Sequence, residues 1–136
     1  MATPHITSPD DPALAELCRK LAALADGTDR SNAWPAEQLQ LCGEAGVYRW
    51  FLDGKDGGQG WTPVDAIRGY MALASACLTT TFIITQRTGA CRRIAGSHND
   101  GLKDRVLPGL ASGDLFSTVG ISHLTTSRRH LGRPVL

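Results

Sequence analysis

Apolar side chains recur every three or four residues along most of this chain, in segments separated by glycine and proline. The first segment follows Asp11-Pro12, an N-cap with proline at the first helical position, and is expected to end at Asp26-Gly27. Four further segments share the period: 32–46, 62–78, 81–94 and 99–111. The pattern therefore predicts a mainly α fold, an irregular bundle of about five helices.

Several helix ends are predicted by residues with a known capping role. Pro35 favours the start of the second helix, and Gly46 suits the left-handed conformation that closes helices. Thr62-Pro63-Val64-Asp65 is similar to a capping box and opens the third. Pro108 lies inside the fifth, where an internal proline costs about 3 kcal/mol, so we expect a kink or a restart there.

The apolar positions of each segment predict the side chains of the core. They lie on one face at the helical period, and in the third segment that face runs from Val64 to Leu78. The predicted core comprises Leu14, Leu17, Leu21, Leu39, Ile67, Met71, Leu78, Ile84, Leu102, Val106 and Leu110.

The sequence changes in character after Gly113. Residues 115–121 favour a β-strand, and 131–136 favour a second short one. A lone strand leaves its backbone donors and acceptors unpaired, which indicates that the chain stops inside a second domain. We therefore predict a flexible lead-in over 1–10, a helical domain over 11–113, and the first strand or strands of an incomplete, truncated β-domain over 114–136.

Charge and composition exclude several classes of protein. With 14 Lys+Arg against 13 Asp+Glu, the net charge of +1 offers no surface for general nucleic-acid binding. The 18 uncharged residues between Arg68 and Arg87 are close to the length of a membrane span, but their polar β-branched cluster favours a break between two helices. The N-terminus has no basic region followed by an apolar core, so we expect a cytoplasmic location and no membrane span.

No local motif identifies a metal or phosphate site. The four cysteines are far apart and the four histidines have no chelating spacing, so no metal ligand is predicted. The glycine-rich loop 54–60 lacks the spacing of a dinucleotide or Walker loop and is interpreted as a structural turn. The hydroxyls and arginines of 122–130 can bind carbonyl or phosphate oxygens, and the alternative is a solvated turn.

Three motifs in order resemble the N-terminal part of the acyl-CoA dehydrogenase superfamily of flavoproteins. They are Leu41-Cys42-Gly43-Glu44-Ala45-Gly46-Val47, Asp56-Gly57-Gly58-Gln59-Gly60 and Leu107-Pro108-Gly109-Leu110-Ala111-Ser112-Gly113-Asp114. The resemblance covers about residues 33–129. It implies a larger, usually tetrameric enzyme with an N-terminal helical domain, a middle β-domain and a C-terminal four-helix domain that together bind FAD.

The resemblance also implies a reaction and a set of site residues. The family oxidises an acyl-CoA next to the thioester carbonyl and passes electrons to a protein partner or to oxygen. Its catalytic base belongs to the C-terminal domain, beyond Leu136, so we expect the isolated chain to be inactive and not to retain FAD. The residues carried over are Val119, Ile121 and Ser122 for the cofactor, and Ser127 and Arg128 for the substrate.

Residues 123–128 depart from the family pattern. His123 replaces the acid, Leu124 the proline, Ser127 a glycine and Arg128 the serine, and these changes bear on the acyl-CoA more than on the flavin. Two alternatives therefore stay open. One is a flavin-dependent monooxygenase or nitroalkane oxidase of the same fold, and the other is a non-catalytic helical interaction module.

Overall fold

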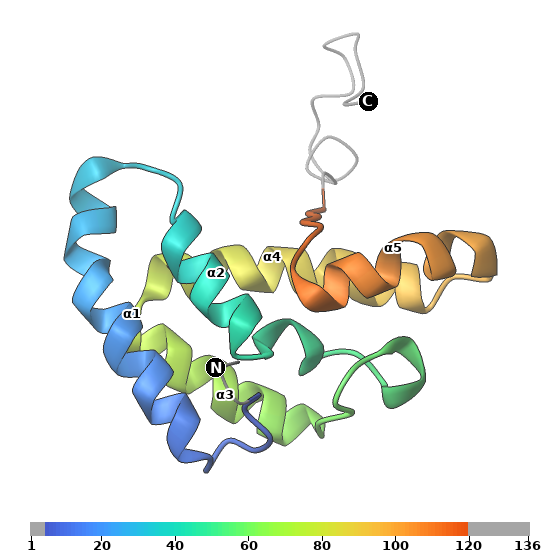
Figure 1. Ribbon diagram of the computed structural model, residues 1–136, viewed down its shortest axis with the longest axis horizontal. Helices are drawn as coiled ribbons and strands as arrows, with labels where there is room; N and C mark the ends of the chain where they lie inside the picture. The colour runs from blue at the N-terminus through green and yellow to red at the C-terminus, as the bar shows by residue number, and fades with distance from the viewer. Residues whose placement is uncertain (1–4, 120–136) are drawn as a thin grey trace, which may run out of the picture.

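The fold is a helical bundle, seen in a computed structural model that describes residues 5–119 (Figure 1). Within that range the secondary structure consists of α1 Pro12–Ser31, α2 Ala36–Glu44, η1 Val47–Arg49, η2 Gly54–Asp56, α3 Pro63–Ala76, α4 Leu78–Ala95 and α5 Asp100–Ser112, where η marks a 3-10 helix. The five predicted helices are therefore confirmed. The described part of the β-prone segment, 115–119, is neither helix nor strand, and the rest lies outside the described residues.

Local capping explains where α1 begins, but the end predicted for this helix differs from the one observed. Asp11 accepts a hydrogen bond from the Ala13 amide at 2.9 Å, as expected of an N-cap before Pro12. The prediction that the helix ends at Asp26-Gly27 is wrong, because α1 continues to Ser31. A side chain at Gly27 would meet nothing within 4 Å, so α1 passes this glycine in open solvent before Asn32 closes it at φ 54°.

The predicted boundaries of the later helices are close to those observed. Thr62 accepts from the Asp65 amide at 3.1 Å, which confirms the cap of α3. Extended backbone at Cys77 separates α3 from α4, so the uncharged stretch does form two helices. Among residues 5–119, no helix is long and apolar enough to cross a membrane. α5 runs through Pro108 without a restart and closes at Gly113.

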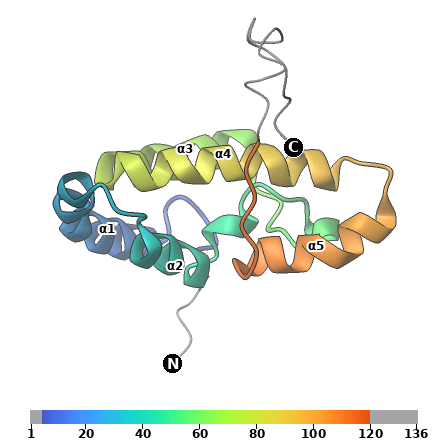
Figure 2. The same cartoon turned by 90° about the horizontal axis from the view of Figure 1, so that it is seen from above.

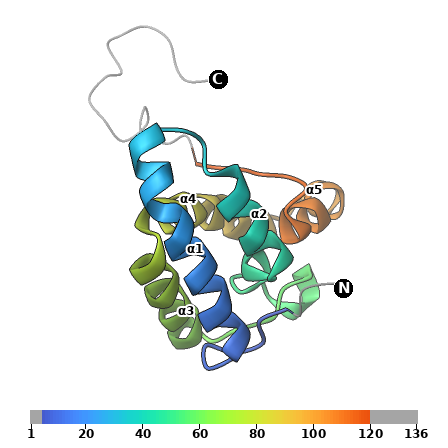
Figure 3. The ribbon, with the colours of Figure 1, turned by 60° about the vertical axis from the view of Figure 1, so that its left-hand side comes forward.

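The helices form two layers. Figure 2 shows α3 and α4 along one side and α1, α2 and α5 along the other. Contacts between α1 and α3 and between α4 and α5 join the layers, while α3 and α4 pack within one of them; Figure 3 shows α1 beside α3. The main core cluster lies between the layers and comprises Ile6, Leu14, Leu17, Leu21, Leu39, Cys42, Ala45, Val47, Tyr48, Trp50, Leu73, Cys77 and Ile84. A second cluster under α5 comprises Leu52, Cys91, Leu107, Leu110 and Ala111.

The predicted buried face of α3 is wrong. Ile67, Met71 and Leu78 are 58%, 65% and 70% exposed, and the helix instead buries Gly69 and Leu73. A Cβ on Gly69 would lie 2.7 Å from Cζ3 of Trp50, so the absence of a side chain there allows the indole to pack directly against the helix. Of the other predicted core residues, Leu102 and Val106 are only half-buried, and Leu14, Leu17, Leu21, Leu39, Ile84 and Leu110 are buried as expected.

Candidate functional site

Only one of the residues assigned to cofactor or substrate is described. Val119 is half-buried, with its Cγ2 3.6 Å from the point where a Cβ on Gly89 of α4 would stand. Ile121, Ser122, Ser127 and Arg128 lie outside the described residues, as does the whole polar cluster 122–130. Their roles stay predictions.

The glycine-rich loop is a turn whose amides are occupied by the chain itself. The Gly58 amide donates to Asp53 O at 3.0 Å, Gln59 to Arg49 O at 2.9 Å, and Gly60 to Leu52 O at 3.1 Å. A phosphate cradle needs free N–H groups that converge on the anion, and these three amides are already bonded to carbonyls. The geometry is that of a structural turn.

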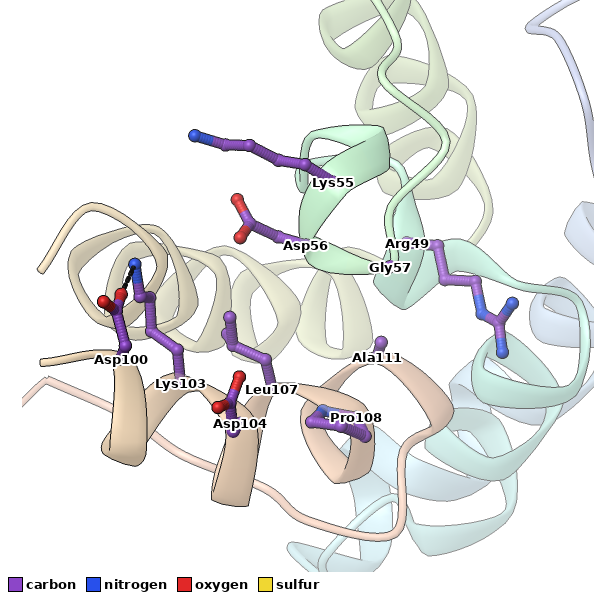
Figure 4. A pocket seen from close by; sticks show the side chains of 10 residues that line it. All are labelled: Arg49, Lys55, Asp56, Gly57, Asp100, Lys103, Asp104, Leu107, Pro108 and Ala111. Atoms are coloured by element: carbon purple, nitrogen blue, oxygen red, sulfur yellow. Dashed lines mark ion pairs between the residues drawn. The ribbon is translucent and has the colours of Figure 1, made fainter.

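A cavity of about 500 Å³ lies between the η1–η2 region and α5 (Figure 4). Its charged lining is balanced, because three basic side chains (Arg49, Lys55, Lys103) accompany three acidic ones (Asp56, Asp100, Asp104). Lys103 pairs with Asp100 at 2.6 Å, and this hydrogen bond lowers the pKa of Asp100 and raises that of Lys103. Within residues 5–119, in this cavity or elsewhere, no three His, Cys, Asp or Glu side chains are placed so that they could hold one metal ion. The cavity offers no excess of charge for a ligand.

Five large apolar side chains are exposed on the layer formed by α3 and α4. Val64, Ile67 and Met71 follow one face of α3, and Leu78 and Phe82 follow in the first turns of α4. Their exposed fractions run from 58% to 70%. We call this set the α3–α4 apolar face. Scattered exposed apolar residues are ordinary, but a run of five on adjoining helices is typical of a surface that another element covers.

The most unusual polar group of the described chain is Arg87 on α4. Its side chain is buried, with 1% of the residue exposed. The centre of its guanidinium lies 4.1 Å from the ring centroid of Tyr48 and 6.0 Å from that of Phe116. Among the described residues, neither Nε nor Nη2 has a hydrogen-bond partner. A buried charged donor without a partner is rare in folded proteins and indicates a missing ligand or partner.

The Tyr48 ring is held rigidly beneath this guanidinium. Its hydroxyl donates to Leu39 O at 2.7 Å. A Cβ added to Gly43 or Gly113 would lie 3.1 Å or 2.9 Å from Cε2 of the ring, so these two glycines leave room for it. Burial raises the pKa of Tyr48, and the nearby Arg87 charge acts in the opposite direction with a smaller effect. Tyr48 therefore stays neutral and gives Arg87 a cation–π contact without a counter-charge.

Tyr70 is a second neutral hydroxyl near Arg87. Its hydroxyl shares a hydrogen bond of 2.6 Å with Thr88 Oγ1. The pKa of Tyr70 is raised to about 12, because burial outweighs the lowering effects of the hydrogen bond with Thr88 and of the Arg87 charge. Tyr70 is therefore neutral and does not supply a negative charge for Arg87.

Sequence reasoning missed Arg87, although a signal for it exists. The buried positions Thr80, Ile84, Arg87 and Cys91 follow each other at intervals of four, three and four residues along α4. A charged residue on the buried stripe of a helix is the pattern that marks a polar group inside the protein. The stripe was obscured because α4 carries polar β-branched residues on its buried side as well.

One comparison with known proteins, the scan against family models, identifies a family. The family model described as "Acyl-CoA dehydrogenase, N-terminal domain" matches residues 12–114. No curated protein and no solved structure matches the chain.

Proposed function

The chain belongs to the acyl-CoA dehydrogenase family through its N-terminal domain, and we propose that this domain forms one wall of the substrate and flavin cleft of an FAD-dependent oxidoreductase. The reaction proposed for the whole enzyme is the oxidation of an acyl thioester next to its carbonyl. Bound FAD would accept the hydride. The electrons then pass to a protein partner or to oxygen, and the enzyme assembles as a homo-oligomer.

The α3–α4 apolar face is the observation that supports this role. Fully burying one large apolar side chain stabilises an assembly by about 1.5–3 kcal/mol, so five of them offer a substantial interface. A wall of this kind would exclude water from an acyl group or pack against apolar side chains of the other domains. The balanced cavity beside α5 offers no comparable surface.

The described residues contribute shape and water exclusion to the proposed cleft. Of the residues that would hold FAD, only Val119 lies within the described range, and it packs on α4 beside Gly89. The proposed contacts of Ile121 and Ser122 with the flavin, and of Ser127 and Arg128 with the substrate, rest on the family resemblance. The catalytic base is assigned to the C-terminal domain of the family, so no described residue is proposed as catalytic.

The gene product purified from its source cells is expected to carry a flavin. Its absorption bands should bleach when an acyl-CoA is added anaerobically, because the substrate reduces the cofactor. The 136-residue chain, purified alone, is expected to show no acyl-CoA-dependent dye reduction. Flavin that is reduced only by a separate reductase, followed by oxygenation of a substrate, would favour the monooxygenase. A gene product that never contains flavin would favour the remaining alternative, a non-catalytic helical interaction module.

Met71→Glu is expected to leave the stability of the 136-residue chain within about 0.5 kcal/mol of wild type, because the side chain is 65% exposed. In the flavin-containing gene product the same change should release flavin or abolish acyl-CoA-dependent bleaching, since a carboxylate would be buried in the cleft wall. Urea unfolding measures the first effect and absorbance the second.

Ala23→Glu is the matched control for this substitution, because Ala23 is exposed on α1, away from the α3–α4 apolar face. It should change neither stability nor flavin content. Equal flavin content and bleaching in the Met71→Glu and Ala23→Glu products would contradict the assignment of the wall.

A further inference from the structure

Arg87 carries a buried charge that no acidic side chain of this chain neutralises. All 13 acidic residues of the sequence lie within the described range, at positions 10 to 114, and residues 120–136 contain neither Asp nor Glu. The ion pairs among residues 5–119 involve other basic residues, and none includes Arg87. The counter-charge must therefore come from a group outside this set of side chains.

Nε and Nη2, which have no hydrogen-bond partner among the described residues, lie on one edge of the guanidinium. The N–H bonds of Nε and Nη2 point in nearly the same direction, and together they form a fork that matches two oxygens of a carboxylate or a phosphate. Tyr48 occupies the flat face of the group at 4.1 Å, so the ring fixes the plane of the fork and leaves its edge unbonded.

We propose that Arg87 binds the carboxylate or phosphate group of a small-molecule ligand through its Nε–H and Nη2–H edge. The 1% exposure of Arg87 favours a small ligand, because an acidic side chain fixed on the surface of a folded partner does not reach so deep. Tyr48 packs on the guanidinium, and since Tyr48 and Tyr70 are both neutral, neither competes with the ligand as an anion. This site is independent of the oxidoreductase function proposed above.

The segment 115–119 runs along α4 beside Arg87, and the proposed ligand would enter past it. Phe116 lies over the guanidinium, Ser117 Oγ is 3.8 Å from Cys91 Sγ, and Val119 packs beside Gly89. This stretch is neither helix nor strand, and Phe116 is itself 41% exposed. A local displacement of these residues from α4 would give the ligand access to Arg87 without unfolding a helix.

Nitrogen-15 NMR of the arginine side chains tests the proposal on the 136-residue chain. The Nε–Hε signal of Arg87, assigned by its loss in Arg87→Met, is expected to shift saturably when propionate or inorganic phosphate is added, relative to sodium chloride at equal ionic strength. The probe that saturates at the lower concentration shows whether the ligand group is a carboxylate or a phosphate. Arg93→Met, which alters an exposed arginine of the same helix, should keep both the signal and its response.

The melting temperature gives a second and independent readout. The favoured anion should raise the Tm of the wild type and of Arg93→Met by several degrees at saturation, because it binds only the folded state. Arg87→Met should show no rise. Without added anion this variant should melt at or above the wild-type temperature, because methionine removes an unpaired buried charge.

Three results would overturn the proposal. The first is an Arg87 signal that responds to neither anion in a folded chain. The second is an equal response to sodium chloride, which would show screening only. The third is a shift that follows protein concentration and not anion concentration, which would assign the counter-charge to an acidic residue of a second copy.

Discussion

Gly58→Ala is expected to destabilise the chain by about 4 kcal/mol or more, a large effect for one methyl group. The added Cβ would stand 1.8 Å from the Leu52 carbonyl oxygen and 2.2 Å from its carbon. These are backbone atoms, so no rotation of a side chain relieves the contact. The Leu52 oxygen also accepts the Gly60 amide at 3.1 Å, and this turn bond would be lost when the backbone moves.

Urea unfolding followed by circular dichroism measures this loss. Gly54→Ala is the matched control, because a Cβ at Gly54 meets nothing within 4 Å and the residue belongs to the same loop. It should unfold within about 1 kcal/mol of wild type. The assignment of loop 54–60 as a tightly packed structural turn fails if both variants unfold at the same urea concentration.

Trp50→Ala should cost about 3–5 kcal/mol, the range of large-to-small substitutions in protein cores. Trp50 is 1% exposed, stacks on Trp61 with ring centroids 4.4 Å apart, and packs against Gly69 of α3. The indole thus packs the connection between α2 and α3 against helix α3. Since domains are stable by about 5–15 kcal/mol, the variant should be partly unfolded at room temperature if the chain lies at the low end of that range.

Thermal and urea unfolding of Trp50→Ala are best compared with those of Trp34→Ala. Trp34 is 60% exposed and meets Phe116 edge-on at 5.7 Å. Its removal should cost no more than about 1 kcal/mol. A larger loss from Trp34 than from Trp50 would contradict the core described above.

Local sequence predicted the helices well because their signals act over one or two turns. Asp11 and Thr62 cap their helices through hydrogen bonds to amides two and three residues away. Gly46 and Gly113 close α2 and α5 in the left-handed conformation. Such interactions need no information about distant parts of the chain, which is why the number of helices and most of their ends were predictable.

The buried face of α3 was not predictable in this way. Its larger apolar residues, Ile67 and Met71, point outward, and Gly69 faces the core, because the bulk that fills this space comes from Trp50. The spacing of apolar residues along a helix predicts that an apolar face exists, but it does not predict which other element covers that face. α3 carries two such faces, one buried against Trp50 within this domain and one that the described residues leave exposed.

The amino-acid sequence by itself determined the helical architecture, the caps, the structural turn at 54–60 and the resemblance to a flavoprotein family, since each of these depends on neighbouring residues or on motifs in order. Only the tertiary structure decided that the apolar side of α3 is left uncovered and that Arg87 is buried without an acidic partner. Both depend on which residues distant in the chain approach one another, and the free energy of such contacts is set by packing and desolvation, not by local preference.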